Sequence, residues 1–479
     1  MADHTFVEQL TPLDLPMPRA HIRVLLVFPT ANPTPAITQH LQRGLDKLSK
    51  QVPWLSGRVF PTEASPAIRY TADSTLTLVD KGSITASYTT LASQGMPIEA
   101  IPPDVWPLPS TINPLSTTGD PIFTASLFRF ADQGAGLCLS FHHNATDATG
   151  FSEILHLWAR NVADPKFDLS SPPPQGRLSR LSQALSPDLQ NISSLSSEHL
   201  FALHPEYSTL PPTIPKHFPP CTSKTFTISI HWINILKDLM HKHTPNRLTT
   251  NTILCALLWT TITRIRTHRT RTAPLTHDPS PRSRQSTLVT AINARHRIPI
   301  PIPKGKEKEN ENKNPYLGNT VLYALTTLPA TTLSTADEDP IHSLAQICSL
   351  ITKSQSPATI NSRYTAEVYR LLEQNAGSVY VGWDLFNSRD LMITSWADVD
   401  LYGVDFGTGV GRPGFVRLPV VGEAEADGVG VVLPRRRDRD GDGDGGGEML
   451  EVVVMLRGDD MRGLEGDGMW GVVVEGGGR

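Results

Sequence analysis

The chain has 479 residues, of which 39% are hydrophobic and 19% are charged, and its formal net charge is −4. This length allows two or more domains, each with a hydrophobic core of its own. The near-neutral charge balance excludes a strong overall field that would attract nucleic acid or an anionic membrane.

The N-terminal residues do not read as a secretory signal, because Asp3, Glu8 and Asp14 interrupt them before any apolar stretch. The apolar runs at 24–28 and 452–456 are too short to span a bilayer. The four cysteines are widely spaced and form no CxxC pair, which indicates reduced structural thiols and no metal site: Cys138, Cys221, Cys255 and Cys348. We therefore expect a cytoplasmic protein, a monomer, with no membrane partner and no bound metal.

Apolar periodicity predicts most of the elements in the first half of the chain. Residues 22–28 form an apolar run typical of a buried strand, and apolar residues three or four apart from 37 to 52 predict a helix that ends at Pro53. Residues 122–130 and 136–141 read as two strands of a hairpin.

Residues 171–225 are rich in serine and proline with little regular patterning, which is typical of a long crossover between two halves. We place the N-terminal half at 1–185, the crossover linker at 186–225 and the C-terminal half at 226–479. Within the last part, the pattern predicts two strands and four helices: strands at 226–230 and 392–396, and helices at 233–241, 253–266, 341–351 and 365–372.

Eight arginines lie between Arg264 and Arg297, against one acidic residue, Asp278. Two interpretations stay open for this stretch: a solvated face, or an anion site that meets the phosphates of a ligand through charge-assisted hydrogen bonds. Nucleic-acid binding through it is disfavoured by the overall charge, and we expect no nucleic-acid partner.

Two other segments have a distinctive composition. Residues 304–313 alternate lysine with glutamate and asparagine and predict a charged loop. Residues 440–445, with Glu451, match the spelling of a calcium-binding loop, but Pro434 precedes them and a β-branched run at 452–454 follows. Since an EF-hand needs a helix on each side, we reject calcium binding there.

The stretch with the clearest chemistry is HHxxxD, in which His142 and His143 end a predicted strand and Asp147 follows four residues later. A neutral imidazole is a good general base at neutral pH. One of the two histidines is expected to be structural, since neighbours on a strand point to opposite sides. Two other interpretations are weighed: a metal pair, for which no third ligand is visible, and a helix start capped by Thr146 or Asp147.

A second motif, DFGTG at Asp405–Gly409, lies about 260 residues downstream of His143. Together the two motifs resemble the HxxxDG and DFGWG motifs of the BAHD superfamily of coenzyme-A-dependent acyltransferases, especially its fungal trichothecene 3-O-acetyltransferase-like members. Four further segments resemble this family, so that the resemblance covers nearly the whole chain: residues 10–14 (LTPLD), 52–59 (VPWLSGRV), 293–297 (NARHR) and 316–319 (YLGN).

The resemblance implies an α/β fold of two domains, each like a half of chloramphenicol acetyltransferase, with a channel between them. It implies that His143 faces the channel and deprotonates the acceptor, which then attacks an acyl-CoA thioester directly, without an acyl-enzyme. No permanently bound cofactor is expected: acyl-CoA, most simply acetyl-CoA, is the co-substrate, and a hydroxyl of a small secondary metabolite is the acceptor.

The resemblance also implies the roles of other residues. Asp147 turns from the histidine and pairs with Arg295, and His142 supports the strand. The DFGTG segment is mainly structural through Phe406, Gly407 and Gly409, although its Asp405 is kept among the catalytic candidates. Thr394 and Ser395, at the end of a predicted strand, are candidates for contact with CoA or the oxyanion.

Two residues depart from the family pattern: Ala148 stands where the family has glycine, and Thr408 where it has tryptophan. These departures leave open a catalytically weak binding protein of the same fold. An N-acyltransferase or a condensation-type enzyme is the other alternative, because HHxxxD is shared by those relatives, whereas Asp405-Phe406-Gly407 favours the O-acyltransferase.

Overall fold

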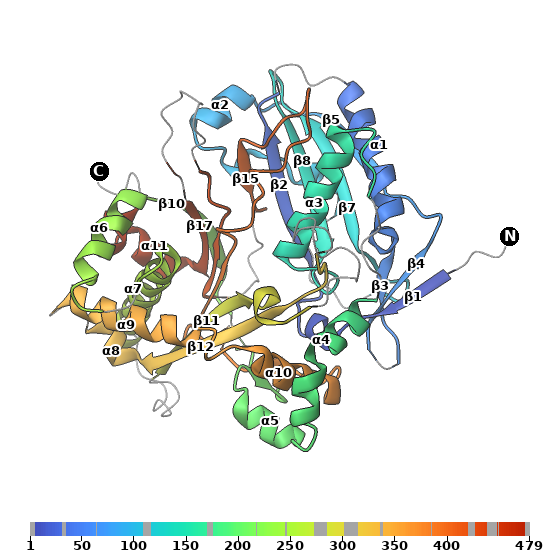
Figure 1. The fold of residues 1–479 in the computed structure, drawn as a ribbon. Helices are drawn as coiled ribbons and strands as arrows, with labels where there is room; N and C mark the ends of the chain where they lie inside the picture. Colours follow the sequence, from blue (N-terminus) through green and yellow to red (C-terminus); the bar gives the residue numbers. More distant parts are fainter. Residues whose placement is uncertain are drawn as a thin grey trace.

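The computed structural model describes most of the chain in two α/β halves that lie side by side (Figure 1). The residues described are 5–30, 35–63, 65–108, 116–169, 176–216, 218–244, 247–272, 285–300, 315–335, 339–384, 386–419, 427–437, 448 and 450–474. Within these ranges, no helix combines the length and the apolar character needed to cross a membrane. The charged segment at 304–313 and the rejected calcium loop at 440–445 lie outside the described residues.

The N-terminal half is built on a mixed sheet in the order β15-β2-β8-β7-β5. Its strands are β2 (His21–Phe28), β5 (Leu78–Ser83), β7 (Phe123–Arg129), β8 (Ala135–His142) and β15 (Phe415–Arg417). A smaller antiparallel sheet, β1-β4-β3-β6, stands next to it, with β1 (Thr5–Gln9), β3 (Arg58–Phe60), β4 (Ala67–Thr71) and β6 (Asp120–Pro121).

Strand β2 is buried on both faces, which explains its unbroken apolar run. Val24, Leu26 and Phe28 face one core, which is shared with helices α1 (Pro35–Gln51) and α3 (Ala148–Ala163). Leu25 and Val27 alternate with them and face a second core under α2 (Tyr88–Ser93). The sheet is therefore a rigid platform, and β8 at its centre ends at the histidine pair.

The C-terminal half has a six-stranded sheet in the order β10-β17-β16-β14-β11-β12. Its strands are β10 (Cys221–Ile228), β11 (Gln285–Asn293), β12 (Val321–Pro329), β14 (Leu391–Ser395), β16 (Val429–Val432) and β17 (Leu450–Arg457). One face packs on α6 (Ile230–Met240), α7 (Thr250–Thr272), α8 (Ala330–Ser334), α9 (Pro340–Ser354), α11 (Gly458–Glu465) and α12 (Gly468–Val473). The other face packs on α4 (Arg177–Asn191), α5 (Ser197–Leu203) and α10 (Ser362–Gln374).

Every strand and helix named from the sequence is present, with ends displaced by up to several residues. The stretch predicted as a crossover contains more regular structure than its patterning indicates, because α4 (Arg177–Asn191) and α5 (Ser197–Leu203) lie in it and β9 (Tyr207–Ser208) pairs with β13 (Tyr380–Val381). Leu181, Ala184 and Leu185 bury one face of α4, and the serines and Pro187 on the rest of this helix obscure the period. Residues 170–175, at the start of the predicted crossover, lie outside the described part.

The chain crosses between the halves more than once, so the division at 185 and 226 stays a prediction. Strand β15 pairs with β2, with Phe415 opposite Val27, and thereby returns the C-terminal chain to the N-terminal sheet. Figure 1 shows β15 beside β2, at the upper centre of the molecule.

Candidate active site

The site forms where the central strand β8 ends and α3 begins. His142 is the last residue of β8, and Asp147 is the N-cap of α3, where its Oδ1 accepts a hydrogen bond from Gly150 N at 3.0 Å. A capped helix start directly after a buried strand fixes both ends of a four-residue turn. Asp147 is thus the N-cap of α3, and this position does not prevent it from having a role in the site as well.

His142 is almost fully buried, with 1% of its surface exposed, and lies opposite His21 on the neighbouring strand. Burial lowers the pKa of His142 to about 3. Electrostatic repulsion from His21, His143 and Arg19 acts in the same direction. Its Nδ1 accepts a hydrogen bond from Asn144 N at 3.3 Å. This bond joins a neutral, buried ring to the main chain of the turn, and the supporting role of His142 stays a prediction.

His143 is partly exposed, unlike its neighbour. Burial of part of the ring lowers its pKa, while its own main-chain carbonyl, Asp147, Asn319 and Asp14 act to raise it. The net effect is a lowered pKa, so the ring is neutral and can accept a proton at pH 7. This is the state that a general base requires before the reaction.

Asp147 is buried and is held by four donors, none of them the His143 ring. Arg295 donates to both carboxylate oxygens at 2.9 Å, Thr320 N donates at 3.0 Å, and Gly150 N is the helix-cap donor. Burial by itself would raise the pKa of Asp147, but Arg295 and the two main-chain donors hold it below its usual value. The carboxylate is therefore charged, and the pairing with Arg295 implied by the family resemblance is present in the structure.

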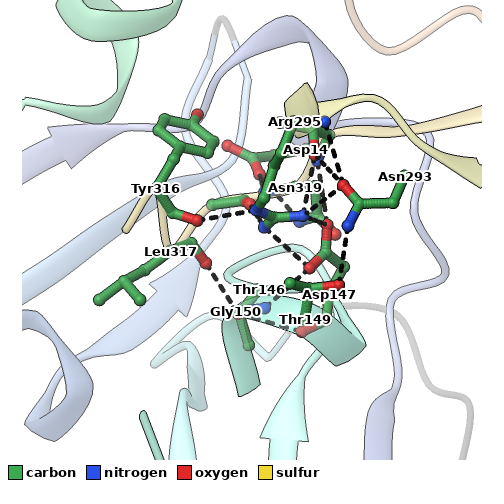
Figure 2. A network of polar contacts seen from close by, with 12 residues as sticks. Asp14, Thr146, Asp147, Thr149, Gly150, Asn293, Arg295, Tyr316, Leu317 and Asn319 are labelled. Carbon is green, nitrogen blue, oxygen red and sulfur yellow. Dashed lines mark hydrogen bonds and ion pairs between the residues drawn. The ribbon is translucent and has the colours of Figure 1, made fainter. Parts of the chain in front are cut away.

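Arg295 links the two halves of the molecule at this point (Figure 2). It begins the short 3-10 helix Arg295–Arg297, which follows β11 in the C-terminal half. Besides Asp147, its guanidinium donates to Tyr316 O at 3.0 Å, Gly318 O at 2.6 Å and Thr320 Oγ1 at 2.8 Å. A bidentate ion pair with so many further acceptors sets both the distance and the angle between the halves here.

A cavity of about 1320 Å³ opens next to this network and is lined from both halves. One face of α3 contributes Thr149, Ser152, Glu153, His156 and Arg160, and the C-terminal half contributes Asn293, His296, Ser395, Asp398 and Asp400. Asn293 Nδ2 donates to Thr149 Oγ1 at 3.1 Å, which joins the wall to the start of α3. Ser395 lines this space, whereas Thr394 and His143 are not among its lining residues. The cavity lies between the halves, and the expectation that His143 faces a channel stays a prediction.

The anion-site interpretation is not supported for three arginines of α7, because each of them is paired within the C-terminal half. The pairs are Arg264 with Asp467 at 2.6 Å, Arg266 with Asp427 at 2.9 Å, and Arg269 with Asp460 at 2.7 Å. The part of the stretch that includes Asp278 lies outside the described residues.

The DFGTG segment is attached to the N-terminal half by packing. Phe406 is 1% exposed and meets the rings of Phe28 and Trp158 edge to face, at centroid distances of 5.7 and 5.4 Å. Gly407 and Gly409 have φ values of +76° and +99°, and a Cβ on Gly407 would lie 2.9 Å from Ala163. Phe406 and Gly407 are thus packed against the N-terminal half, while a Cβ on Gly409 would meet no atom within 4 Å.

Asp405 is not brought into the network around Asp147. Its side chain is 45% exposed and forms an ion pair with Arg412 at 3.0 Å, and its Oδ1 accepts from Gly407 N at 2.9 Å. Asp405 does line the same cavity as Ser395. Of the three catalytic candidates, the structure thus places His143 and Asp147 on one turn and Asp405 apart from them.

The two departures from the family pattern lie where the fold accepts them. Ala148 is the first residue of α3, and it is not among the described residues with positive φ. Thr408 is exposed, so the tryptophan of the family would add surface and not core at this point.

Several residues of the network were given no role from the sequence, among them Asp14, Asn319 and Thr320. The segments at 10–14 and 316–319 signalled this region only by their resemblance to the family, because neither has a composition typical of a site. Asp14, which is fully buried, binds Asn319 through two hydrogen bonds, at 3.0 and 2.8 Å.

Family models and curated relatives match most of the chain. The model of a transferase family matches residues 108–469, and that of a trichothecene 3-O-acetyltransferase-like N-terminal domain matches residues 21–161. A trichothecene 8-O-acetyltransferase of Fusarium sporotrichioides is 26% identical, with 96% of each chain covered. The O-acetyltransferase dmxR13 of Cryptosporiopsis sp. is 26% identical, with 84% of this chain and 85% of the relative covered.

Solved structures share the fold. The TRI101 protein of F. graminearum, in complex with coenzyme A and T-2 mycotoxin, superimposes with a TM-score of 0.74 at 19% identity and covers 98% of this chain and 99% of its own. Vinorine synthase gives a TM-score of 0.61 at 16% identity, over 95% of this chain and 91% of its own. The expected two-domain acyltransferase fold is confirmed.

Proposed function

Because this chain belongs to the transferase family of CoA-dependent acyltransferases, we propose that it transfers an acetyl group from acetyl-CoA to a hydroxyl of a secondary metabolite. That it is an acyltransferase follows from the family. The acetyl donor and the hydroxyl acceptor are supported by the relatives named above, which are O-acetyltransferases.

The observation that carries the proposal is the contrast between the two adjacent histidines. Burial of His142 lowers its pKa to about 3, and its Nδ1 is already bonded to Asn144. His143 is partly exposed and neutral at pH 7 at the junction of the halves. Only the second ring is therefore suited to accept a proton from a substrate.

In the proposed reaction, His143 takes the proton of the acceptor hydroxyl as its oxygen attacks the thioester carbonyl carbon. The tetrahedral oxyanion collapses, the carbon–sulfur bond breaks, and the proton on His143 passes to the CoA thiolate. The products are the acetyl ester and free CoA, and the imidazole is neutral again. No acyl-enzyme is needed, because the two substrates meet in line across one site.

Other residues have supporting roles in this proposal. Asp147 keeps the turn in place through Arg295 and does not relay charge. Of the two oxyanion candidates, Ser395 is preferred to Thr394, because Ser395 lines the cavity. Its hydroxyl can donate a hydrogen bond to a developing oxyanion.

The test is release of free CoA from acetyl-CoA in the presence of matched acceptors: polycyclic alcohols, the corresponding amines and the O-methylated alcohols. We expect release with the alcohols only, and a loss of about 10²–10⁴-fold in kcat for His143→Ala. Ser395→Ala should lower kcat more than Thr394→Ala does. Preference for the amines would indicate an N-acyltransferase, and CoA binding without turnover of any acceptor would indicate a binding protein.

A further inference from the structure

A second buried carboxylate, Asp14, lies at the end of the 3-10 helix Pro12–Asp14 with no exposed surface. Its Oδ2 accepts hydrogen bonds from Thr11 N at 2.7 Å and Thr11 Oγ1 at 2.8 Å, and its Oδ1 accepts from the main chain and side chain of Asn319. Arg177 Nη1 lies 3.7 Å from Oδ2 and also donates to Ala145 O at 2.9 Å. The carboxylate is surrounded by donors and has one positive partner.

Asp14 is connected to the catalytic turn by two routes. Asn319 Nδ2 donates to Asp14 and also to His143 O, at 2.9 Å. Asn144 Nδ2 donates to the main-chain carbonyl of Asp14 at 2.7 Å. The side chain of Asp14 thus holds the carbonyl of His143 through one amide, and its main chain holds the next residue directly.

The dipeptide Asn319-Thr320 donates hydrogen bonds to both buried carboxylates, Asp14 and Asp147. Asn319 N donates to Asp14 and Thr320 N, the next amide, donates to Asp147 at 3.0 Å. Figure 2 shows Asp14, Asn319, Arg295 and Asp147 in one connected group. The turn that carries His143 is therefore held from two sides by charges that meet at a single rigid peptide.

We infer that Asp14 is a positioning residue for His143, acting through Asn319 on the main chain of the catalytic turn. A buried ion pair adds little net stability compared with a well-packed apolar group of similar size. What a charge with four directed donors does supply is a fixed geometry. A displacement of about 1 Å at a reacting group costs on the order of 100-fold in rate, so fixing this turn matters for catalysis.

The inference also concerns the charge around the ring. The titratable and charged groups near His143 are Asp14 with Arg177, Asp147 with Arg295, and the imidazoles His142 and His21. Burial lowers the pKa of His143, and Asp147 and Asp14 both oppose that effect. Burial raises the pKa of Asp14 itself, with Arg177 and the hydrogen bonds from Asn319 and Thr11 opposing that rise. In the pH range where Asp14 is ionised, removal of its charge should therefore lower the pKa of His143 further.

The role in catalysis rests on the proposed function, so the test has one readout that is independent of any acceptor. In protein labelled with ¹³C-histidine, the resonance of His143 is identified by its loss in His143→Gln, and its titration midpoint is measured. We expect Asp14→Asn to lower that midpoint and to reduce kcat at least tenfold, with KM for acetyl-CoA within about threefold. Asn319→Ala keeps the charge but breaks the link, and should reduce kcat as much as Asp14→Asn.

The matched control is Asp460→Asn. Asp460 is equally buried, with no exposed surface, and pairs with Arg269 at 2.7 Å in the C-terminal half, away from the catalytic turn. It should lower the melting temperature but leave kcat per folded molecule and the His143 midpoint unchanged. If Asp14→Asn behaves in the same way as this control, Asp14 only stabilises the fold and the inference is wrong. If the wild type has no transferase activity yet its midpoint shifts in Asp14→Asn, the proposed function fails and the electrostatic link to His143 stands.

Discussion

Asp147 and Asp405 belong to the two signature motifs, yet the fold treats them in opposite ways. Asp147 has a side chain that is 4% exposed and an arginine that is 11% exposed, whereas Asp405 and Arg412 are 45% and 46% exposed. The first pair joins the two halves beside His143, and the second closes a short loop at the rim of the cavity.

The two segments around these residues differ in the kind of contact that fixes them. The HHxxxD turn is held by charge and hydrogen bonds, so its geometry depends on directed partners. The DFGTG segment is held by Phe406 against Phe28 and Trp158, so its attachment depends on shape and apolar area. Substitutions in the first should therefore affect both the rate and the stability, and those in the second should affect the stability alone.

The largest effect in this comparison is expected from Asp147→Asn. It leaves Arg295 buried without its anion, which costs about 3–5 kcal/mol in the free energy of unfolding. We also expect kcat to fall about 10–100-fold in the folded fraction, because the turn loses its link to the other half. Urea denaturation and steady-state kinetics measure the two effects, and an unchanged kcat would show that the turn holds its place without the pair.

The same carboxylate predicts how stability depends on pH. The folded-state pKa of Asp147 lies below the ordinary value of 3.8. Its contribution is therefore complete above the unfolded-state pKa and is lost as the pH falls below it, toward the folded-state value. Denaturation midpoints measured from pH 7 down to pH 3 should fall more steeply for the wild type than for Asp147→Asn, and parallel curves would contradict the assignment.

Phe406→Ala tests the second region. The buried ring fills space between α3 and β2, and its removal should cost about 3–5 kcal/mol of stability. Because no hydrogen bond to the catalytic turn is removed, kcat per folded molecule should stay within about twofold of the wild type. A tenfold loss of kcat without a loss of stability would mean that this segment acts on the chemistry directly.

Asp405→Asn should have a much smaller effect. A half-exposed ion pair is worth about 0–1 kcal/mol, and we expect a change in stability within that range and a kcat within about threefold of the wild type. Kinetics at saturating acetyl-CoA provide the test. A loss of tenfold or more in kcat would indicate that Asp405 takes part in catalysis, and the contrast with Asp147 would no longer hold.

The smallest effect is expected from Ala148→Gly, which restores the residue of the family. The alanine begins α3 without positive φ, so glycine offers no conformational relief and costs less than about 1 kcal/mol in helix propensity. Both kcat and the midpoint of thermal unfolding should change little. A clear gain in kcat would show that the methyl group obstructs the site.

The sequence predicted those parts of the molecule that local patterns determine. Strand β2 and helix α1 follow from apolar periods, and the histidine pair follows from its place after an apolar run. Helix α4 was missed because serine and Pro187 obscure its apolar face. The role of Asp14 could not be predicted, since its partner Asn319 is 305 residues away and no local pattern encodes that contact.

The return of β15 to the N-terminal sheet has a consequence for biosynthesis. Strand β2 lies between β15 and β8, so its outer edge has no partner until residues 415–417 leave the ribosome. At about 5–20 residues per second, synthesis of the nearly 400 intervening residues takes roughly 20–80 s. During that interval the nascent chain exposes an unpaired apolar strand edge, which is a template for aggregation. Expression of this protein should therefore depend on chaperones that bind during translation.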